Sequence, residues 1–307
     1  MQIMSTGQQR AQSISIQVSD RVRCNARCKF CISRTTPGNG TNVDVKTCLP
    51  HRLKIGLRLA ERMGATHAIL TGKADPMQEN IEYLCLLAKQ ASKYMPIVDM
   101  HTNGFGFMIK EESFKMLVNF GLNMITFSVA SFNEDDNKEL MGINQNPQYL
   151  IALAKKHNLL IRCSLVINKK GVNDITGIMN YIQMAGNLGV HMVVIREVWV
   201  PEVGRNYDAG VLAWNKENKI PIAPLEEEFK KIAKDCHNPF GLQRRDPLPW
   251  GVPVFAIGNI FDNPDHGVNI TFACCDQANS GPVMKSIVHK PNGHGYRNWD
   301  HEGDILY

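Results

Sequence analysis

The sequence predicts an α/β fold, a partial (β/α)6 TIM-like barrel followed by a small C-terminal extension. Short apolar segments alternate with amphipathic helical segments six times between about residues 13 and 200, an order typical of a parallel sheet. The chain has 307 residues, enough for a barrel within one chain. After residue 200 the sequence becomes rich in Gly, Pro, Asn and His. We therefore predict a barrel core at 1–200 and an extension at 201–307 that acts as a substrate cap.

The predicted strands are short segments that are either apolar or alternate between apolar and polar residues. They cover residues 13–19, 67–71, 97–102, 123–130, 159–168 and 190–198. Parallel strands place their carboxyl ends at one edge of a barrel, where active sites of this architecture lie. Polar residues at those ends are therefore the candidates for function.

The helices between the strands are predicted from apolar residues three and four positions apart. The first begins near Pro50, where a missing N–H is tolerated, and ends before Gly64, which suits a left-handed cap. Others are predicted near 81–88, 111–119, 147–157 and 174–188. In the extension we expect a loop at 201–223, a helix at 224–236 and strands at 252–257 and 268–274.

The composition places the chain among globular proteins. Hydrophobic residues make up 44% and charged residues 21%, and the net charge is +5. These values exclude a disordered or collagen-like chain. The sequence shows neither an apolar signal segment nor a membrane-length apolar run. We therefore predict a cytoplasmic protein with reduced thiols and no membrane partner, and a nucleic-acid partner is allowed without being indicated.

Three cysteines carry the strongest signal. Cys24, Cys28 and Cys31 form a CxxxCxxC motif in the loop after the first predicted strand. Three thiolates on one loop suit three irons of a [4Fe–4S] cluster and leave the fourth iron open, as a catalytic metal site requires. Two alternatives are a zinc site that includes Cys48 or His51, and a disulfide that leaves one thiol spare.

At these residues the sequence resembles the radical S-adenosylmethionine (SAM) superfamily. The segment SISIQVSDRVRCNARCKFC is similar to that family's first strand and cluster loop, with the aromatic Phe30 just before the third cysteine. The resemblance implies a [4Fe–4S] cluster on the three cysteines and SAM as second cofactor. It further implies that an electron from the cluster cleaves SAM to methionine and a 5′-deoxyadenosyl radical, which abstracts hydrogen from the substrate.

The resemblance also assigns SAM contacts to the ends of later strands. The turn Thr71-Gly72-Lys73-Ala74-Asp75-Pro76 resembles the family's Gly-Gly-Glu-Pro turn, which binds the SAM amino group, although Asp75 replaces the longer Glu. The alternative is an ordinary strand-to-helix turn capped by an acid. The remaining predicted cofactor contacts are Phe30, Asn103, Ser128, Ser131, Arg162 and Ser164. Arg196 is a candidate catalytic residue, and because neighbouring strand residues face opposite sides, Arg196 or Glu197 points inward, not both.

The other cysteines divide into two groups. Cys85 and Cys163 fall inside predicted elements and are expected to pack in the core, and Cys48 is expected to be inert. Cys236, Cys274 and Cys275 could hold an auxiliary cluster, and Cys275 could instead donate a hydrogen atom to the substrate.

We predict an enzyme that acts on a small metabolite or peptide in a biosynthetic or maturation pathway. The alternative is an RNA- or nucleotide-modifying member of the same family. A third hypothesis is a cluster protein for electron transfer or regulation, against which the open iron argues. The resemblance implies an external one-electron donor of the flavodoxin or ferredoxin kind.

Overall fold

The computed structural model describes residues 10–19, 24–35, 50–201, 208–249, 251–258, 267–273, 283–299 and 305–307. Eleven strands form one open sheet in the order β13-β12-β2-β3-β4-β5-β6-β7-β10-β9-β8. β2 to β7 pair in parallel with sequential neighbours, and β12 and β10 add a further parallel strand at each edge. These strands are β2 (Ser13–Gln17), β3 (His67–Thr71), β4 (Ile97–Thr102), β5 (Met124–Ser128), β6 (Leu160–Ile167), β7 (Met192–Glu197), β10 (Val268–Ala273) and β12 (Ile287–His289).

The short strands complete the sheet at its margins. β9 (Val254–Ile257) and β8 (Gln243–Arg245) continue it antiparallel beyond β10, and β13 (Gly295–Tyr296) pairs antiparallel with β12. A separate parallel pair joins β1 (Arg10–Ala11) to β11 (Val283–Met284). The partial barrel is confirmed, and the described part of the extension does not form a sheet of its own but lengthens the barrel sheet at both edges.

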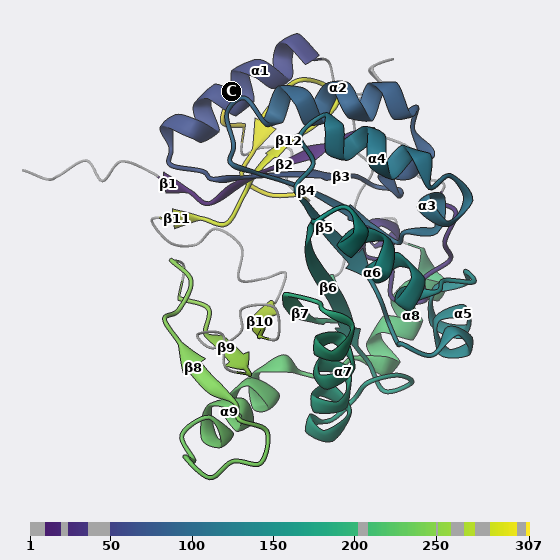
Figure 1. The fold of residues 1–307 in the computed structure, drawn as a ribbon, viewed down its shortest axis with the longest axis vertical. Helices are drawn as coiled ribbons and strands as arrows, with labels where there is room; N and C mark the ends of the chain where they lie inside the picture. The colour runs from purple at the N-terminus through teal and green to yellow at the C-terminus, as the bar shows by residue number, and fades with distance from the viewer. Residues whose placement is uncertain are drawn as a thin grey trace, which may run out of the picture.

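Helices cover one face of the sheet and define its outside (Figure 1). The outward side chains of the strands are apolar and fully buried, as Ile14 and Ile16 of β2 show by packing in one core with Leu53 and Leu57 of α1. The helices are α1 (Pro50–Arg62), α2 (Ile81–Ala91), α3 (Phe105–Ile109), α4 (Glu112–Asn119), α5 (Glu134–Met141), α6 (Pro147–Lys156), α7 (Ile175–Leu188), α8 (Ala209–Asn218) and α9 (Ile222–Ile232), with 3₁₀ turns η1 (Ile32–Arg34) and η2 (Pro76–Gln78).

Most predicted element boundaries agree with the structure to within two residues, but one prediction is wrong and several short elements were not predicted. The region 201–223 was expected to be a loop, yet it contains α8 and the start of α9. The sequence of α8 shows no apolar stripe because two of its buried positions are Asn215 and Asn218, which bond backbone carbonyls. The short helices α3 and α5 were also not predicted. Strand β12 was missed because its three residues give no pattern.

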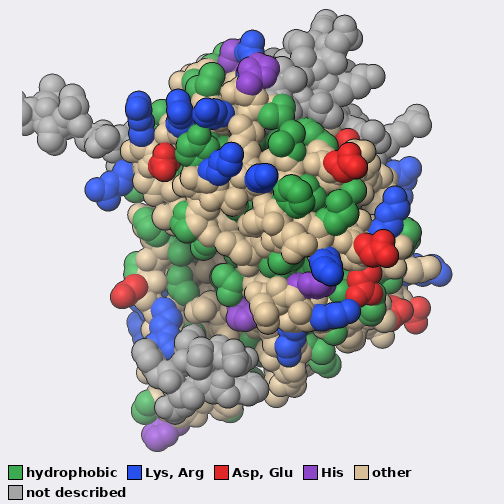
Figure 2. Space-filling model, turned by 45° about the horizontal axis from the view of Figure 1, so that its top comes forward, with side chains coloured by type: hydrophobic (Ala, Val, Ile, Leu, Met, Phe, Trp, Pro, Cys, Tyr) green, Lys and Arg blue, Asp and Glu red, His purple; other side chains and the backbone are tan. Residues whose placement is uncertain are grey.

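Among the described helices, none combines the length and apolar character needed to cross a membrane. In Figure 2 several basic side chains lie together at the upper left, and most acidic side chains lie at the right. On α1, Lys54, Arg58 and Arg62 are exposed at four-residue spacing.

Candidate active site

The loop that carries the CxxxCxxC motif packs against a hydrophobic cluster that is separate from the main core. Two backbone bonds fix it to the end of α5, from Arg27 N to Met141 O at 2.8 Å and from Lys29 N to Leu140 O at 2.9 Å. Gly142, which ends α5 at a φ of 67°, leaves room for the Arg27 Cβ at close approach. A second hydrophobic cluster surrounds the loop, comprising Ala26, Ala130, Leu140, Met141 and Ile143 with Cys24, Cys28, Phe30, Phe105 and Trp214 against it.

The three thiols fit the donor set of an iron–sulfur cluster. Cys24, Cys28 and Cys31 are all free and partly buried. Burial raises the pKa of Cys28. Negative charge on Cys31 and Cys24 raises this pKa further, to a smaller extent, so the three thiols lie close enough to interact electrostatically. Burial likewise raises the pKa of Cys24. A bound metal centre reverses this preference, because a coordinating thiol loses its proton outright.

Within the described parts of the chain, no three His, Cys, Asp or Glu side chains gather as they would around a single metal ion. Thiolates of a cubane bind different iron atoms and need not meet at one point. Structural zinc takes four ligands, and Cys48, one of the two candidates for the fourth, lies outside the described residues.

The turn after β3 is fastened by Asp75. This carboxyl is buried and accepts from Met77 N at 3.0 Å, Asn103 N at 2.5 Å and Thr102 Oγ1 at 2.9 Å. Burial raises the pKa of Asp75, and these hydrogen bonds oppose the rise. The acid-capped turn is therefore present, and contact between Asp75 and SAM stays a prediction. Lys73 of the same turn is also buried.

Asn103 connects this turn to the cluster loop. Its amide nitrogen lies 3.9 Å from Cys24 Sγ and donates to Asn25 Oδ1 at 2.9 Å. Gln145, itself fully buried, donates to Asn103 O at 2.5 Å and Ser128 O at 2.9 Å, which ties the ends of β4 and β5 together. Asn103 and Ser128 thus lie at the same edge as the cysteines.

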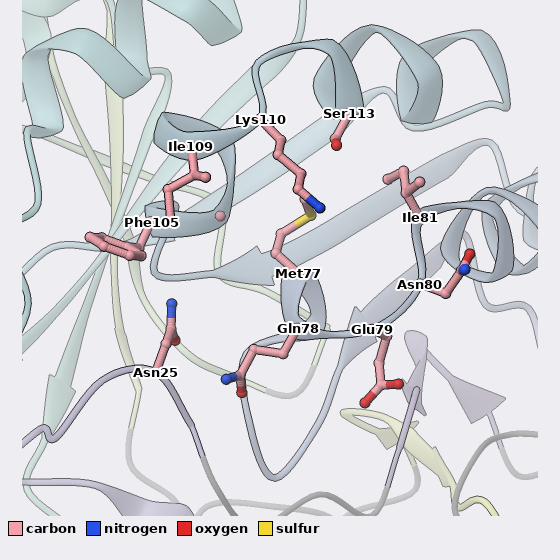
Figure 3. A pocket seen from close by; sticks show the side chains of 11 residues that line it. Asn25, Met77, Gln78, Glu79, Asn80, Ile81, Phe105, Ile109, Lys110 and Ser113 are labelled. Carbon is pink, nitrogen blue, oxygen red and sulfur yellow. The ribbon is translucent and has the colours of Figure 1, made fainter.

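A cavity of about 370 Å³ is lined by Asn25 and by residues of η2, α2, α3 and α4. Figure 3 shows Met77, Phe105 and Ile109 around it, with Lys110 and Glu79 as its charged residues. Asn25, one of its lining residues, directly follows Cys24 in the chain.

The inner face of the sheet carries a group of polar and charged side chains, whereas the interior of such barrels is usually apolar. Asp99 is fully buried there and is contacted by Arg162 Nη2 at 2.6 Å, His101 Nε2 at 3.1 Å and Thr126 Oγ1 at 2.9 Å. His67 lies 3.7 Å from the same carboxylate. The pKa of Asp99 is held well below its usual range because the guanidinium and histidine partners outweigh burial.

The Arg162 guanidinium makes further contacts besides its ion pair with Asp99. Its Nη2 also lies 2.9 Å from His101 Nε2, and its Nε donates to Thr126 at 2.9 Å. Within the described residues its Nη1 has no hydrogen-bond partner. Burial lowers the pKa of His101, which is therefore neutral near pH 7. The inward positions of β3 to β7 then hold one carboxylate and two guanidinium groups, those of Asp99, Arg162 and Arg196.

The end of β7 confirms that Arg196 and Glu197 face opposite sides. Arg196 Nε donates to Ser164 Oγ at 2.9 Å on the inner face. Glu197 instead binds Lys219 Nζ at 2.5 Å and accepts from Ile222 N at 2.8 Å. Arg196 and Ser164 thus meet in the interior, as their sequence positions predict.

Other predicted residues lie farther from this centre or cannot be placed. The Ser131 hydroxyl bonds Asp136 at 2.9 Å in the first turn of α5. Cys236 is exposed, whereas Cys85 and Cys163 are buried as expected. Cys48, Cys274 and Cys275 lie outside the described residues, so the auxiliary cluster and the hydrogen donor stay predictions.

Asp99, Thr126 and His67 were not predicted from the sequence as site residues. Their signal was nevertheless present, because polar residues lie two positions apart in β4, β5 and β6, as Asp99 and His101, Thr126 and Ser128, and Arg162 and Ser164, and His67 and Thr71 share one face of β3. In strands that helices cover on one side, such alternation marks the opposite face. The sequence of α8 showed no comparable pattern that would predict its contact with the cluster loop.

Comparison with known proteins supports this picture. The family model of the radical SAM superfamily matches residues 19–178, more than half of the chain. A probable GTP 3′,8-cyclase of Pyrococcus abyssi is 24% identical over 71% of this chain and 66% of its own length. The GTP 3′,8-cyclase of Aquifex aeolicus is 30% identical over 57% of this chain and 53% of its own. The matches thus span about half to two thirds of these curated relatives.

Solved structures show the same fold at low identity. Streptococcus suis SuiB aligns with a TM-score of 0.58 and 13% identity, over 95% of this chain and 61% of SuiB. Native anSMEcpe with bound AdoMet and Kp18Cys peptide aligns with a TM-score of 0.55 and 11% identity, over 96% of this chain and 77% of its own. With its family match and its three-cysteine loop, the chain belongs to the radical SAM superfamily, whose enzymes use a [4Fe–4S] cluster and S-adenosylmethionine.

Proposed function

We propose that this radical SAM enzyme acts on a small anionic substrate held against the inner face of the sheet, and that this substrate is a nucleotide. The observation that carries the proposal is the pair of inward guanidinium groups, Arg162 and Arg196, opposed by the single carboxylate Asp99. Guanidinium groups bind phosphate through paired charge-assisted hydrogen bonds. The named activity of the relatives, cyclisation of GTP, supports the same substrate class.

The position of each group of residues suggests its role in the proposed reaction. Cys24, Cys28 and Cys31 would hold the cluster, and Gly72–Asp75 with Asn103 and Ser128 would border SAM at the carboxyl edge of the strands. When bound, the cluster and SAM would supply the radical chemistry that removes a hydrogen atom from the substrate. Arg162 Nη1 and the Arg196 guanidinium would orient the anionic end of the substrate. Asp99 keeps Arg162 in place from behind.

The electron is proposed to come from an external one-electron donor protein. The extension from residue 201 onward is proposed as the substrate cap, since its strands β10 and β12 continue the two edges of the barrel sheet. On β10, Asn269 and Thr271 alternate with the buried Ile270 and Phe272 and add further polar groups to the inner face.

The test uses anaerobically reconstituted protein with SAM and dithionite. We expect a nucleoside triphosphate to raise 5′-deoxyadenosine formation above the substrate-free rate, and the matching nucleoside without phosphates to fail. Ribose-deuterated nucleotide should transfer deuterium to 5′-deoxyadenosine. Arg196→Gln should raise the KM for the nucleotide by about 10- to 100-fold, the range for a hydrogen bond to a charged group. Lys156→Gln on the outer surface serves as the matched control.

A peptide or uncharged metabolite that stimulates cleavage while every nucleotide fails would overturn the proposal. Stimulation by an RNA oligonucleotide but not by free nucleotides would overturn it as well. In that case binding should weaken steeply with salt, as expected for contacts to a phosphate backbone. The exposed row Lys54, Arg58 and Arg62 on α1 would then be the first surface to neutralise.

A further inference from the structure

Helix α8 joins two distant parts of the barrel. It begins after Asp208, which caps it by accepting from Val211 N at 3.1 Å, and it ends at Asn218. One end of the helix contacts the cluster loop, which follows β2. The other end contacts residues at the ends of β6 and β7, four and five strands away along the sheet. Figure 1 places α8 close to α5, the helix that also supports the cluster loop.

The contact with the cluster loop combines charge and backbone bonding. Arg34, the last residue of η1, donates through Nε to Asp208 Oδ2 at 3.0 Å, and its Nη2 contacts the same oxygen. Asp208 N in turn donates to Arg34 O at 3.1 Å. The pair is half-exposed, and the pKa of Asp208 is lowered by its bond from Val211 N and by Arg34. Arg34 lies three residues after Cys31, whose carbonyl accepts from Arg34 N at 3.2 Å.

An aromatic contact lies at Trp214, six residues after Asp208. The rings of Trp214 and Phe30 are 6.3 Å apart at 49°, within the range of favourable ring pairs. Both side chains pack against the apolar cluster that also contacts Cys24 and Cys28. Trp214 of α8 and Leu140 and Met141 of α5 therefore belong to the same apolar cluster as the cluster loop.

The far end of α8 is fixed just as firmly. Asn215 Nδ2 donates to Trp199 O at 2.9 Å, and Lys169 N donates to Asn218 O at 3.1 Å. Lys219 Nζ lies 2.5 Å from Glu197 at the end of β7. A helix held at both ends transmits displacement of one end to the other, because its backbone does not stretch.

We propose that α8 is a strap that positions the cluster loop, with Asp208 and Trp214 as its positioning residues. The strap holds the iron-binding loop in the geometry for cluster retention and shields it from water. It also links that loop to the strand ends that carry Arg196 and border the substrate. The proposal rests on membership of the superfamily and not on the choice of substrate.

The test begins with Asp208→Asn, which keeps a good helix cap and removes only the charge. In the reconstituted enzyme, iron release to a chelator should accelerate by about two- to fivefold, the effect expected for a half-exposed ion pair. Amide exchange of residues 24–35 should rise in the metal-free protein. Glu111→Gln, which breaks the exposed Glu111–Lys156 pair, is the control and should change neither.

Two further comparisons separate positioning from general stability. The double variant Arg34→Gln with Asp208→Asn should accelerate iron release and amide exchange no more than either change alone, because both changes remove the same contact. Trp214→Ala should alter the electron paramagnetic resonance spectrum and raise the reduction potential of the cluster, since water favours the more charged reduced state. In Trp214→Phe the spectrum and the reduction potential should return most of the way to the wild-type values.

Unchanged exchange in 24–35 and unchanged iron release in Asp208→Asn and Trp214→Ala would overturn the proposal. Additive effects of the Arg34 and Asp208 changes would overturn it too. If these readouts move as expected while nucleotides fail to stimulate SAM cleavage, the strap stands and only the substrate proposal fails.

Discussion

Asp99 is the residue whose loss we expect to cost the most stability among the polar groups of the barrel. It is fully buried and receives Arg162 at 2.6 Å, Thr126 at 2.9 Å and His101 at 3.1 Å. Removing one partner of a buried ion pair costs about 3–5 kcal/mol, because the other charge stays buried and unpaired. The Arg162 side chain retains 20% exposure to water. We therefore expect Asp99→Asn to lower the free energy of unfolding by about 3 kcal/mol, the lower end of that range.

The assay is urea unfolding of the metal-free protein, followed by circular dichroism. A second variant, Asp99→Asn with Arg162→Met, removes both charges and should recover more than about 1 kcal/mol of the loss, since paired removal leaves no orphaned charge. Glu111→Gln, at an exposed ion pair, should leave the unfolding midpoint unchanged.

The pH dependence supplies an independent check. The pKa of Asp99 is lower in the folded than in the unfolded chain, so its stabilising contribution is complete above the unfolded value of about 3.9. It is lost as the pH falls through the folded value. The difference between wild type and Asp99→Asn should thus be constant from about pH 7 to 8, and the part of it that comes from the Asp99 charge should be lost below about pH 4. Between these limits the variant also changes the titration of His101, because Asp99 raises the pKa of that histidine. A single-variant loss under about 1 kcal/mol at pH 7, or a double variant that costs the sum of its parts, would refute the reasoning.

Three shorter predictions follow from other sites. Cys28→Ala should abolish both iron retention and 5′-deoxyadenosine formation, measured by iron content and chromatography, and retained cleavage would contradict the cluster assignment. Gly104→Ala should lower the melting temperature, because φ is 77° there and a Cβ would overlap Leu150; an unchanged melting temperature would argue against that packing. Burial lowers the pKa of His289 to about 4, so its contribution is complete above the unfolded pKa of about 6.5 and is lost as the pH falls toward 4. His289→Gln should flatten the stability curve across that interval, whereas an identical slope in the variant would exclude His289 as its source.

The strands and their order were predictable because the pattern that encodes them is local. The segment His67–Thr71 and the segment Ile97–Thr102 have the predicted bounds, and α1 begins at Pro50 as expected. Each boundary is set by a proline, a glycine or an asparagine cap within a few residues of the element. In these strands, buried apolar side chains alternate with inward positions that include polar residues. The sequence therefore indicated which side chains face the barrel interior, although only some of them were predicted as site residues.

The helix α8 and the outer strands could not be predicted in this way. Asn215 and Asn218 take buried positions of α8 because they bond carbonyls that tertiary structure brings to them. β12 is three residues long and forms because β2 offers an unpaired edge. Neither element has a periodic pattern, since its stabilising partners lie far away along the chain.

By itself, the sequence determined the class of chemistry and the frame that supports it. Three cysteines at fixed spacing define the cluster loop, and the repeated strand–helix pattern defines a sheet that ends beside it. Only the tertiary structure decided how the charges meet, because Asp99 and Arg162 are 63 residues apart and Arg34 and Asp208 are 174 apart. Local patterns specify elements through backbone propensity and amphipathicity, whereas the partners of a buried charge or a cluster loop are chosen by the packing of the whole chain.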